Sequence, residues 1–371
     1  MLLDNKKAGK MSWKCAAIDH GITIFSNGKI GPCCQIQADY LKPINELRDP
    51  HRFADLKTEY PPSACEKCIS DEENNLPSYR NMFNQLEKTT TGLQFVDIRN
   101  INHCNLKCRY CGPHFSSSWA KELGEPTTRY QDIGQYKDVL ITNDLHWMYF
   151  TGGEPLINPE HWILLQELID SNRAGNISLR YNTNLTTIKY KDVDIINLWS
   201  RFKSVEVLCS IDAIGDPLEY IRSGCEWAKI ENNLQALLQS THNSKITVKF
   251  TPVLSILNIW FIAELFDYAE KYHIPVNLTV LTGPDYLALD VIPDQLKEQA
   301  LSQLNAIKQH LTSTMFEYIS KLIHNNINNC LFNHTINHTL LLDNNRNEKL
   351  FNLLPFKEIA RDQLLKNYEY E

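Results

Sequence analysis

The sequence predicts an α/β protein built on an open, partial barrel of parallel strands. Six short apolar runs rich in β-branched residues alternate with amphipathic stretches between residues 91 and 285. Such alternation is typical of a parallel sheet with helical crossovers. Because six units are too few to close a TIM barrel, we expect a TIM-like partial (β/α)6 barrel.

The expected elements follow one another along the chain. The strands are expected at Leu93–Ile98, Met148–Thr151, Ile177–Tyr181, Val205–Ser210, Ile246–Thr251 and Val276–Val280. The clearest helices between them are expected at His161–Asn172, Ala228–Gln239 and Trp260–Tyr272. The region after the barrel predicts helices at Asp294–Thr312 and Thr314–Asn325, interrupted by Asn-rich breaks at Asn325–Asn329 and Asp343–Asn347.

Bulk properties favour a globular, cytoplasmic protein. The chain has 371 residues and a formal net charge of −7, a balance that disfavours nucleic acid as a partner. No apolar run approaches the length of a membrane span. The first 14 residues are polar and carry lysines, without the apolar core of a signal peptide.

Cysteine usage divides the chain further. Structural disulfides are rare in the cytosol, yet the chain has eleven cysteines, most of them in tight groups before residue 112. Residues 1–90 are rich in Cys, Pro and Gly and poor in periodic pattern, so a metal would supply stability that a small core cannot. We therefore expect a Cys-rich domain over 1–90, the partial barrel over 91–285 and a mostly helical extension over 286–371.

A cysteine triplet marks the expected active centre. Cys104, Cys108 and Cys111 follow the first expected strand, in a loop at its C-terminal end. That end of the strands carries the chemistry in parallel α/β folds. Three thiolates can bind three irons of a [4Fe–4S] cubane and leave the fourth iron open. A zinc site or a redox dithiol is the alternative, although zinc sites usually show paired C-x2-C units.

The second expected strand ends in Gly152, Gly153, Glu154 and Pro155. Paired glycines let a ligand approach the backbone closely, and a glutamate can accept a hydrogen bond from a cationic amine. Alone, this turn is a weak signal, because Gly and Pro mark many loops. Its position one strand after the cysteine triplet strengthens it.

The spacing Cys104-x3-Cys108-x2-Cys111, with the aromatic Tyr110 before the last cysteine, resembles the signature of the radical SAM superfamily. Gly152–Pro155 resembles the motif with which that superfamily binds the amino group of methionine. The resemblance covers residues 91–285 and implies the radical SAM type of partial barrel. It also implies that a reduced [4Fe–4S] cluster cleaves S-adenosylmethionine to a 5′-deoxyadenosyl radical, which abstracts a hydrogen atom from the substrate. A flavodoxin or ferredoxin would donate the electron.

The resemblance implies further residues that bind S-adenosylmethionine. Ser210 and Asp212 resemble the family's Ser-x-Asp segment, and Arg222 follows Ser210 by twelve residues. In anaerobic sulfatase-maturing relatives, a serine and an arginine so placed hold the methionine carboxylate. A surface ion pair with Glu219 is the alternative for Arg222.

A further segment resembles the family's ribose-binding region. Thr183 and Asn184 end the third expected strand and resemble the family's Thr-Asn segment near the ribose. A helix N-cap or a turn is the alternative for this pair.

The N-terminal cysteines form a second candidate metal site. Cys15, Cys33, Cys65 and Cys68 supply two separated pairs, enough for a closed zinc or iron–sulfur site. Gly28 is expected in a hairpin turn between residues 21–25 and 29–31 that brings Cys15 and Cys33 together.

The order of these cysteines, C-x12-G-x4-C followed by C-x2-C, resembles half of a SPASM motif, the twitch domain. The resemblance implies an auxiliary [4Fe–4S] cluster, here before the barrel instead of after it. A structural zinc ribbon is the alternative, and either Cys33 or Cys34 can be the ligand.

The resemblance implies an enzyme and leaves its substrate open. SPASM and twitch relatives often modify ribosomally made peptides, so a precursor peptide or a natural-product precursor is the first hypothesis. A small-molecule dehydrogenase or carbon-skeleton enzyme is the second. An iron–sulfur electron carrier without catalytic activity is the third. No general acid or base is assigned.

Overall fold

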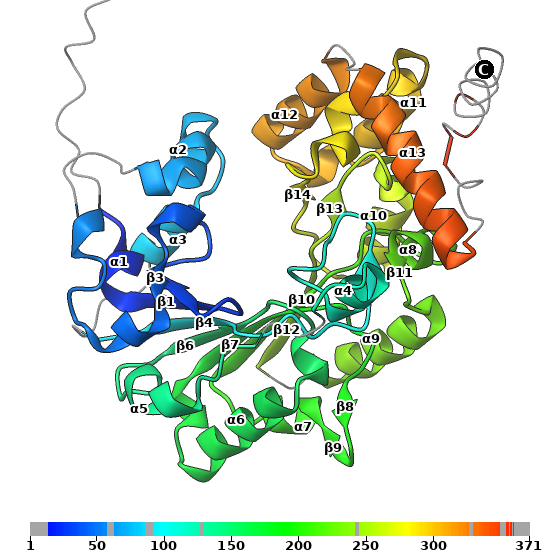
Figure 1. Ribbon diagram of the computed structural model, residues 1–371. Coiled ribbons are helices and arrows are strands. Elements are labelled where there is room, and N and C mark those ends of the chain that lie inside the picture. The colour runs from blue at the N-terminus through cyan, green and yellow to red at the C-terminus, as the bar shows by residue number, and fades with distance from the viewer. Residues whose placement is uncertain are drawn as a thin grey trace, which may run out of the picture.

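A computed structural model describes residues 14–57, 63–85, 92–126, 130–241, 245–325, 329–348, 354, 355, 357 and 359. An eight-stranded, mostly parallel sheet forms its centre (Figure 1). In spatial order the strands are β12 (Ile246–Phe250), β10 (Ser204–Cys209), β7 (Ser178–Thr183), β6 (Trp147–Phe150), β4 (Phe95–Arg99), β1 (Gly21–Phe25), β2 (Lys29–Gly31) and β3 (Lys42–Pro43). The strands from β12 to β1 run parallel, whereas β2 and β3 are antiparallel.

Five of the six expected strands lie in this sheet, and the sixth does not. Val276 makes only an isolated bridge to Phe250, and the short β14 (Thr279–Val280) pairs with β13 (Val253–Leu254) in a separate ladder. Pro275 precedes this run and has no N–H to donate, which limits the ladder there. The result is an α/β partial barrel whose sheet is extended at the other edge.

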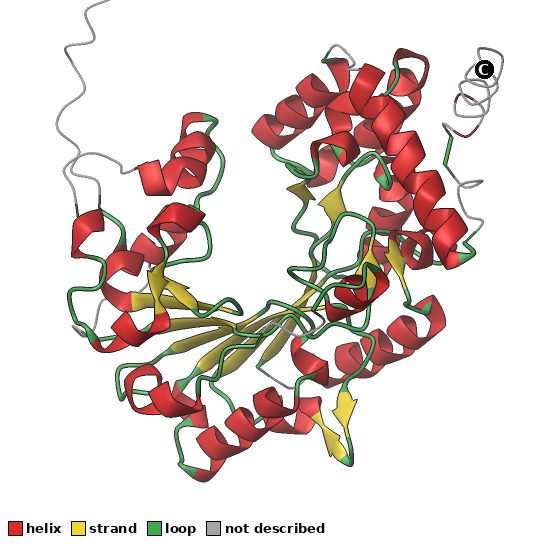
Figure 2. Cartoon of the chain, viewed as in Figure 1, coloured by secondary structure: helices red, strands yellow, loops and turns green. Residues whose placement is uncertain are grey.

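The two faces of the sheet differ because successive side chains in a strand point to opposite sides. On the outer face, the ring of Phe150 lies 4.8 Å from that of His161, and Tyr181 lies 4.9 Å from Trp199. These two partners belong to α6 (Pro159–Asp170) and α7 (Ile195–Trp199), which cover this face together with α9 (Trp227–Thr241) (Figure 2). The inner face instead carries a polar row in register, formed by Asp97, Tyr149, Arg180 and Glu206.

The N-terminal residues extend the barrel's own sheet. The expected hairpin is confirmed, since β1 and β2 pair across a turn in which Gly28 has a φ of +78°. Strand β1 also pairs in parallel with β4, so the sheet crosses the predicted domain boundary near residue 90. Three short helices accompany it, namely α1 (Ala16–His20), α2 (Glu66–Glu73) and α3 (Tyr79–Gln85).

The remaining helices lie in the connections between strands and in the C-terminal region. They are α4 (Ser117–Glu122), α5 (Lys137–Leu140), α8 (Asp216–Ile221), α10 (Ile262–Lys271), α11 (Asp294–Ala306), α12 (Ser313–His324) and α13 (Asn329–Arg346). None of the helices in the described part of the chain is long and apolar enough to cross a membrane.

The expected break at Asp343–Asn347 is wrong, because α13 continues to Arg346. Asn has a poor helix propensity, but Asp343 and Arg346 form buried ion pairs that hold this last turn. Of the other expected break, residues 326–328 lie outside the described residues.

Candidate active site

The cysteine triplet lies in the loop that follows β4. Cys108 sits in the two-residue strand β5 (Lys107–Cys108), which pairs with β11 (Arg222–Ser223). Helix α4 fixes the loop from outside. Ser118 Oγ donates to the Cys104 carbonyl at 2.8 Å, and Trp119 Nε1 donates to the Cys108 carbonyl at 2.8 Å.

Burial governs the protonation of the three thiols. It raises the pKa of Cys104 and of Cys111, and it raises the pKa of Cys108 to about 12 although the nearby Arg222 opposes the shift. The metal-free protein therefore holds neutral thiols, which must release their protons when metal binds.

The donor set of the triplet fits an iron–sulfur cubane. Among the described residues, no three His, Cys, Asp or Glu side chains converge as the ligands of a single ion do. A cubane distributes three thiolates over three separate irons, so it needs no such convergence.

The glycines of the Gly152–Pro155 turn make room for the cysteine loop itself. A Cβ added to Gly153 would lie 2.1 Å from the His103 carbonyl oxygen, and one on Gly152 would lie 2.9 Å from that of Ile101. Gly152 also has a φ of +97°, which disfavours any other residue. In return, the Glu154 N–H donates to the His103 carbonyl at 2.7 Å. These backbone contacts fix the position of the Gly-Gly-Glu turn relative to the cysteine loop.

Glu154 is fully enclosed and already satisfied by its own chain. Its carboxylate accepts hydrogen bonds from the Leu156 N–H at 3.1 Å, from Thr183 Oγ1 at 2.8 Å and from the Asn184 N–H at 2.6 Å. Burial nonetheless raises its pKa to about 7. Thr183 and Asn184 therefore hold the carboxylate of Glu154, the glutamate of the Gly-Gly-Glu turn, in place. The sequence analysis did not predict this role.

Arg222 is buried, with 7% of its surface exposed, which rules out the alternative of a surface ion pair with Glu219. Its Nε donates to Asp212 Oδ2 at 2.7 Å, and its Nη1 lies 3.7 Å from Cys108 Sγ. Tyr110 donates its hydroxyl to the same Asp212 oxygen at 2.6 Å. Glu219 instead accepts a hydrogen bond from the Trp227 N–H at 2.7 Å.

Most of the predicted residues meet in one pocket. Its lining includes Cys104, Cys108, Tyr110, Cys111, Gly152, Gly153, Glu154, Thr183, Asn184, Ser210 and Arg222. Asp212 and Pro155 do not line the pocket. Asp212 instead accepts a hydrogen bond from Arg222, which does line it. Thr151, Asn182 and the exposed Phe115 line it as well, without a motif in the sequence that singles them out.

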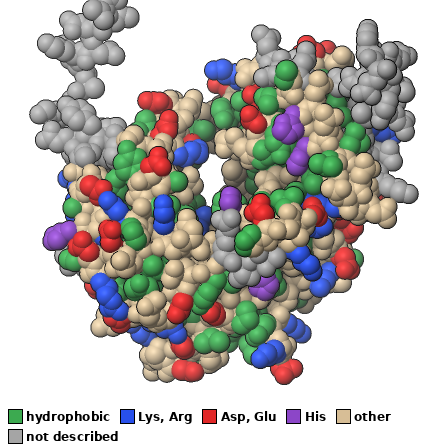
Figure 3. Space-filling model, viewed as in Figure 1, with side chains coloured by type: hydrophobic (Ala, Val, Ile, Leu, Met, Phe, Trp, Pro, Cys, Tyr) green, Lys and Arg blue, Asp and Glu red, His purple; other side chains and the backbone are tan. Residues whose placement is uncertain are grey.

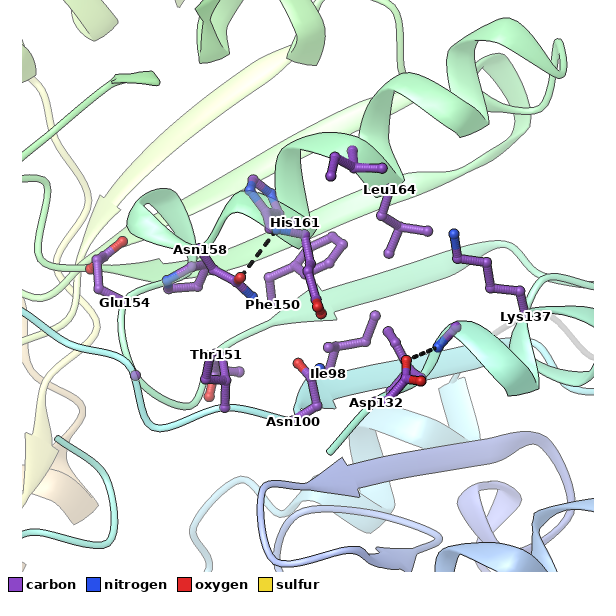
Figure 4. Close-up of a pocket in the computed structure, with 17 residues that line it drawn as sticks. Ile98, Asn100, Asp132, Lys137, Phe150, Thr151, Glu154, Asn158, His161 and Leu164 are labelled. Carbon is purple, nitrogen blue, oxygen red and sulfur yellow. Dashed lines mark hydrogen bonds between the residues drawn. The ribbon is translucent and has the colours of Figure 1, made fainter. Parts of the chain in front are cut away.

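A second pocket lies on the helix side of the same turn (Figure 4). Asp132, Lys137, Asn158 and His161 line it, and Thr151, Gly153 and Glu154 line both pockets. No motif in the sequence predicted this pocket.

The four predicted auxiliary ligands lie at the ends of short elements in the N-terminal region. Cys15 precedes α1, Cys33 follows β2, and Cys65 and Cys68 stand at the start of α2. Burial and the nearby thiols of Cys34, Cys15 and Cys68 raise the pKa of Cys33. These contacts place three of the four predicted auxiliary ligands within electrostatic reach of one another.

Cys34 has different surroundings. Burial raises its pKa to about 11, with Arg99 opposing the shift and Asp97 adding to it. Both of these neighbours belong to β4 on the inner face of the sheet. The choice of Cys33 over Cys34 as the auxiliary ligand stays a prediction.

Fold and site together define an α/β protein with a thiol-lined pocket at the carboxyl edge of a parallel sheet. Residues 101–269 match the family model described as the Radical SAM superfamily. This part of the chain is therefore a radical SAM domain, and it contains the cysteine triplet, the Gly-Gly-Glu turn and Arg222.

Curated relatives match over limited stretches. The chain is 23% identical over 190 residues to a GTP 3′,8-cyclase of Aliarcobacter butzleri, which covers 49% of this chain and 57% of the relative. It is 22% identical over 138 residues to a 7-carboxy-7-deazaguanine synthase of Thermoplasma acidophilum, covering 37% of this chain and 61% of the relative. The chain thus spans less than two thirds of the length of these relatives.

Among solved structures, the chain resembles native anSMEcpe with bound AdoMet at a TM-score of 0.43 and 17% identity, over 67% of each chain. It also resembles Streptococcus suis SuiB bound to S-adenosylmethionine at a TM-score of 0.38 and 16% identity, over 73% of this chain and 59% of the other.

Proposed function

We propose that this enzyme reductively cleaves S-adenosylmethionine on a [4Fe–4S] cluster held by Cys104, Cys108 and Cys111. The observation that carries the proposal is the single pocket shared by the three thiols, the Gly-Gly-Glu turn and Arg222. When bound, the cluster supplies an electron to the sulfonium, and the resulting 5′-deoxyadenosyl radical takes a hydrogen atom from the substrate.

The chain's own residues orient the cosubstrate in this proposal. The Arg222 guanidinium suits a carboxylate, and its Nε is fixed by Asp212, so its remaining N–H groups are held in one direction. Ser210 lies on the same wall at the end of β10. Thr183 and Asn184 hold Glu154 in the turn proposed to face the methionine amine.

A second, auxiliary cluster on Cys15, Cys33, Cys65 and Cys68 is part of the proposal. The N-terminal segment and the C-terminal helices stand on the same side of the sheet with an opening between them (Figures 1 and 3). A substrate over the inner face would then lie between the two metal sites. If Cys15, Cys33, Cys65 and Cys68 hold a cluster, it would supply an electron acceptor on that side of the substrate.

A ribosomally made peptide or natural-product precursor is the proposed substrate class, with flavodoxin or ferredoxin as electron donor. In this proposal the substrate binds in the opening between the two sides (Figure 3). A small molecule is the second candidate, favoured by the similarity of the barrel to GTP 3′,8-cyclases.

The deciding experiment measures 5′-deoxyadenosine formed by reconstituted, dithionite-reduced protein. The expected result is slow formation without substrate and faster formation with the true substrate. Complete absence of 5′-deoxyadenosine, with the cluster present and reduced, would contradict the proposal. Adding GTP in one arm and candidate precursor peptides in another, with mass analysis of each, separates the two substrate classes.

A further inference from the structure

The residue directly after the second cysteine of the triplet points away from the pocket. Arg109 is almost fully buried, with 2% of its surface exposed, although it sits in the loop that carries Cys108. Its Nε donates to the Tyr220 carbonyl at 2.9 Å, and its guanidinium lies 3.7 Å from the centre of the Tyr220 ring. A buried cation in this position needs anionic partners.

Those partners come from the far end of the chain. Arg109 pairs with Asp343 in the last turn of α13 and with Glu348 just beyond it. Figure 1 shows α13 running beside α8, β11 and α4, the elements around the cysteine loop. We refer to Asp343, Arg346 and Glu348 as the α13 clamp.

Glu348 holds both strands of the small ladder that carries the site. One of its carboxylate oxygens accepts from Arg109, next to β5, and the other accepts from the Ser223 hydroxyl in β11. In this ladder Cys108 is paired with Arg222, and both face the pocket. Because neighbouring side chains alternate, Arg109 and Ser223 point to the opposite side, where Glu348 bridges them.

A second ion pair fixes the start of the ladder. Arg346 pairs with Glu122 of α4 and donates from Nη1 to the Lys107 carbonyl at 3.0 Å. Lys107 itself pairs with Glu122. Three cations and three carboxylates therefore meet behind the cysteine loop, namely Lys107, Arg109 and Arg346 with Glu122, Asp343 and Glu348.

We propose that the α13 clamp positions the cluster ligand Cys108 and the cosubstrate-binding Arg222, with Arg109 and Ser223 as the residues through which it acts. This proposal rests on the proposed function only for what the pocket binds. The contacts themselves are independent of any cofactor. It gives the helical C-terminal region a direct part in the chemistry of the pocket.

Hydrogen exchange of the iron-free, full-length protein tests the clamp. Glu348→Gln and Asp343→Asn each keep the side-chain size and remove one charge from the cluster. The amides of residues 105–111, which include the Arg109 N–H bonded to the Ile221 carbonyl at 2.8 Å, are expected to exchange at least about tenfold faster, as the loss of a hydrogen bond to a charged group implies. Asp294→Asn, in an exposed pair with Lys297 on α11, is the matched control and should leave these amides unchanged.

The iron-loaded protein gives the second readout. In both clamp variants the change that S-adenosylmethionine causes in the EPR spectrum of the reduced cluster should weaken, and 5′-deoxyadenosine formation should fall about 10- to 100-fold, as for other residues that orient metal ligands. If Glu348→Gln does not fold, Ser223→Ala removes one bond of the bridge and serves the same measurements. Unchanged exchange and an unchanged EPR response in folded variants would overturn the proposal. A wild-type protein without any 5′-deoxyadenosine would instead overturn the proposed function and leave the exchange test of the clamp decisive.

Discussion

Arg222 Nε lies 2.7 Å from Asp212 Oδ2, and both side chains are buried beside Cys108. The pair joins the end of β10 to the ladder that carries the cysteine, so it connects the predicted S-adenosylmethionine ligands to the fold. Asp212 also accepts the Val253 N–H at 2.8 Å and the Tyr110 hydroxyl. Its role is therefore as much structural as functional.

Breaking this pair on one side should destabilise the protein. Arg222→Gln leaves the Asp212 carboxylate buried without its cation, which costs about 3–5 kcal/mol. The double variant Asp212→Asn/Arg222→Gln removes both charges and keeps hydrogen-bonding groups, so it should regain more than half of that loss. Urea unfolding measures both. A single variant as stable as wild type would show that the pair contributes nothing to folding.

The iron content should separate the two metal sites. Wild type should bind about eight irons, four for each cubane. Replacing Cys104, Cys108 and Cys111 by Ala should remove about half of the iron and all cleavage of S-adenosylmethionine. Replacing Cys65 and Cys68 should remove the other half and leave some uncoupled cleavage. About four irons with zinc in the wild-type protein would contradict an auxiliary cluster.

Single variants should decide between the adjacent cysteines. Cys33 lies within electrostatic reach of Cys15 and Cys68, whereas Cys34 faces Arg99 and Asp97. Cys33→Ala should therefore lose the auxiliary iron, about half of the total, and Cys34→Ala should keep it. Iron and sulfide analysis of the two purified variants checks this. The reverse pattern would exchange the two assignments.

Gly153→Ala should disrupt the cysteine loop. Its Cβ would meet the His103 carbonyl oxygen at 2.1 Å, so the backbone must move, at a cost above about 1 kcal/mol. Thermal unfolding and bound iron should both fall. Gly175→Ala is the control, because a Cβ there meets nothing within 4 Å and its effect should stay near zero or be slightly stabilising.

His161 should make the fold sensitive to mild acid. Burial lowers its pKa from 6.5 to about 3, and its Nε2 lies 2.7 Å from the Tyr181 hydroxyl. Since the folded state keeps the ring neutral, stability is complete above pH 6.5 and is lost as pH falls toward 3, by about 1.4 kcal/mol per pH unit. Urea unfolding at pH 7.5 and 5.5 should show a smaller pH dependence for His161→Gln. Replacing the exposed His51 should leave the dependence unchanged.

Five of the expected strands and the position of the triplet followed from local pattern. Apolar periodicity marks β4, β6, β7, β10 and β12, and the cysteine spacing lies within one loop. The pocket assembles these residues because all the strands end at one edge of a parallel sheet. The sixth expected strand forms only in part, as the bridge at Val276 and the short β14. Pro275 lacks an N–H for the ladder, and apolar periodicity carries no information about such pairing.

The sequence by itself determined the radical SAM motifs, the order of most barrel elements and most residues of the pocket, since each depends on spacing within short segments. Only the tertiary structure decided that β1 joins the barrel sheet, that Arg222 pairs with Asp212 instead of Glu219, and that α13 reaches Arg109. A periodic pattern in the sequence cannot reveal an ion pair between residues more than two hundred positions apart, such as Arg109 and Asp343. Their pairing depends on the free energy of burying charges together, which exists only once the chain has folded.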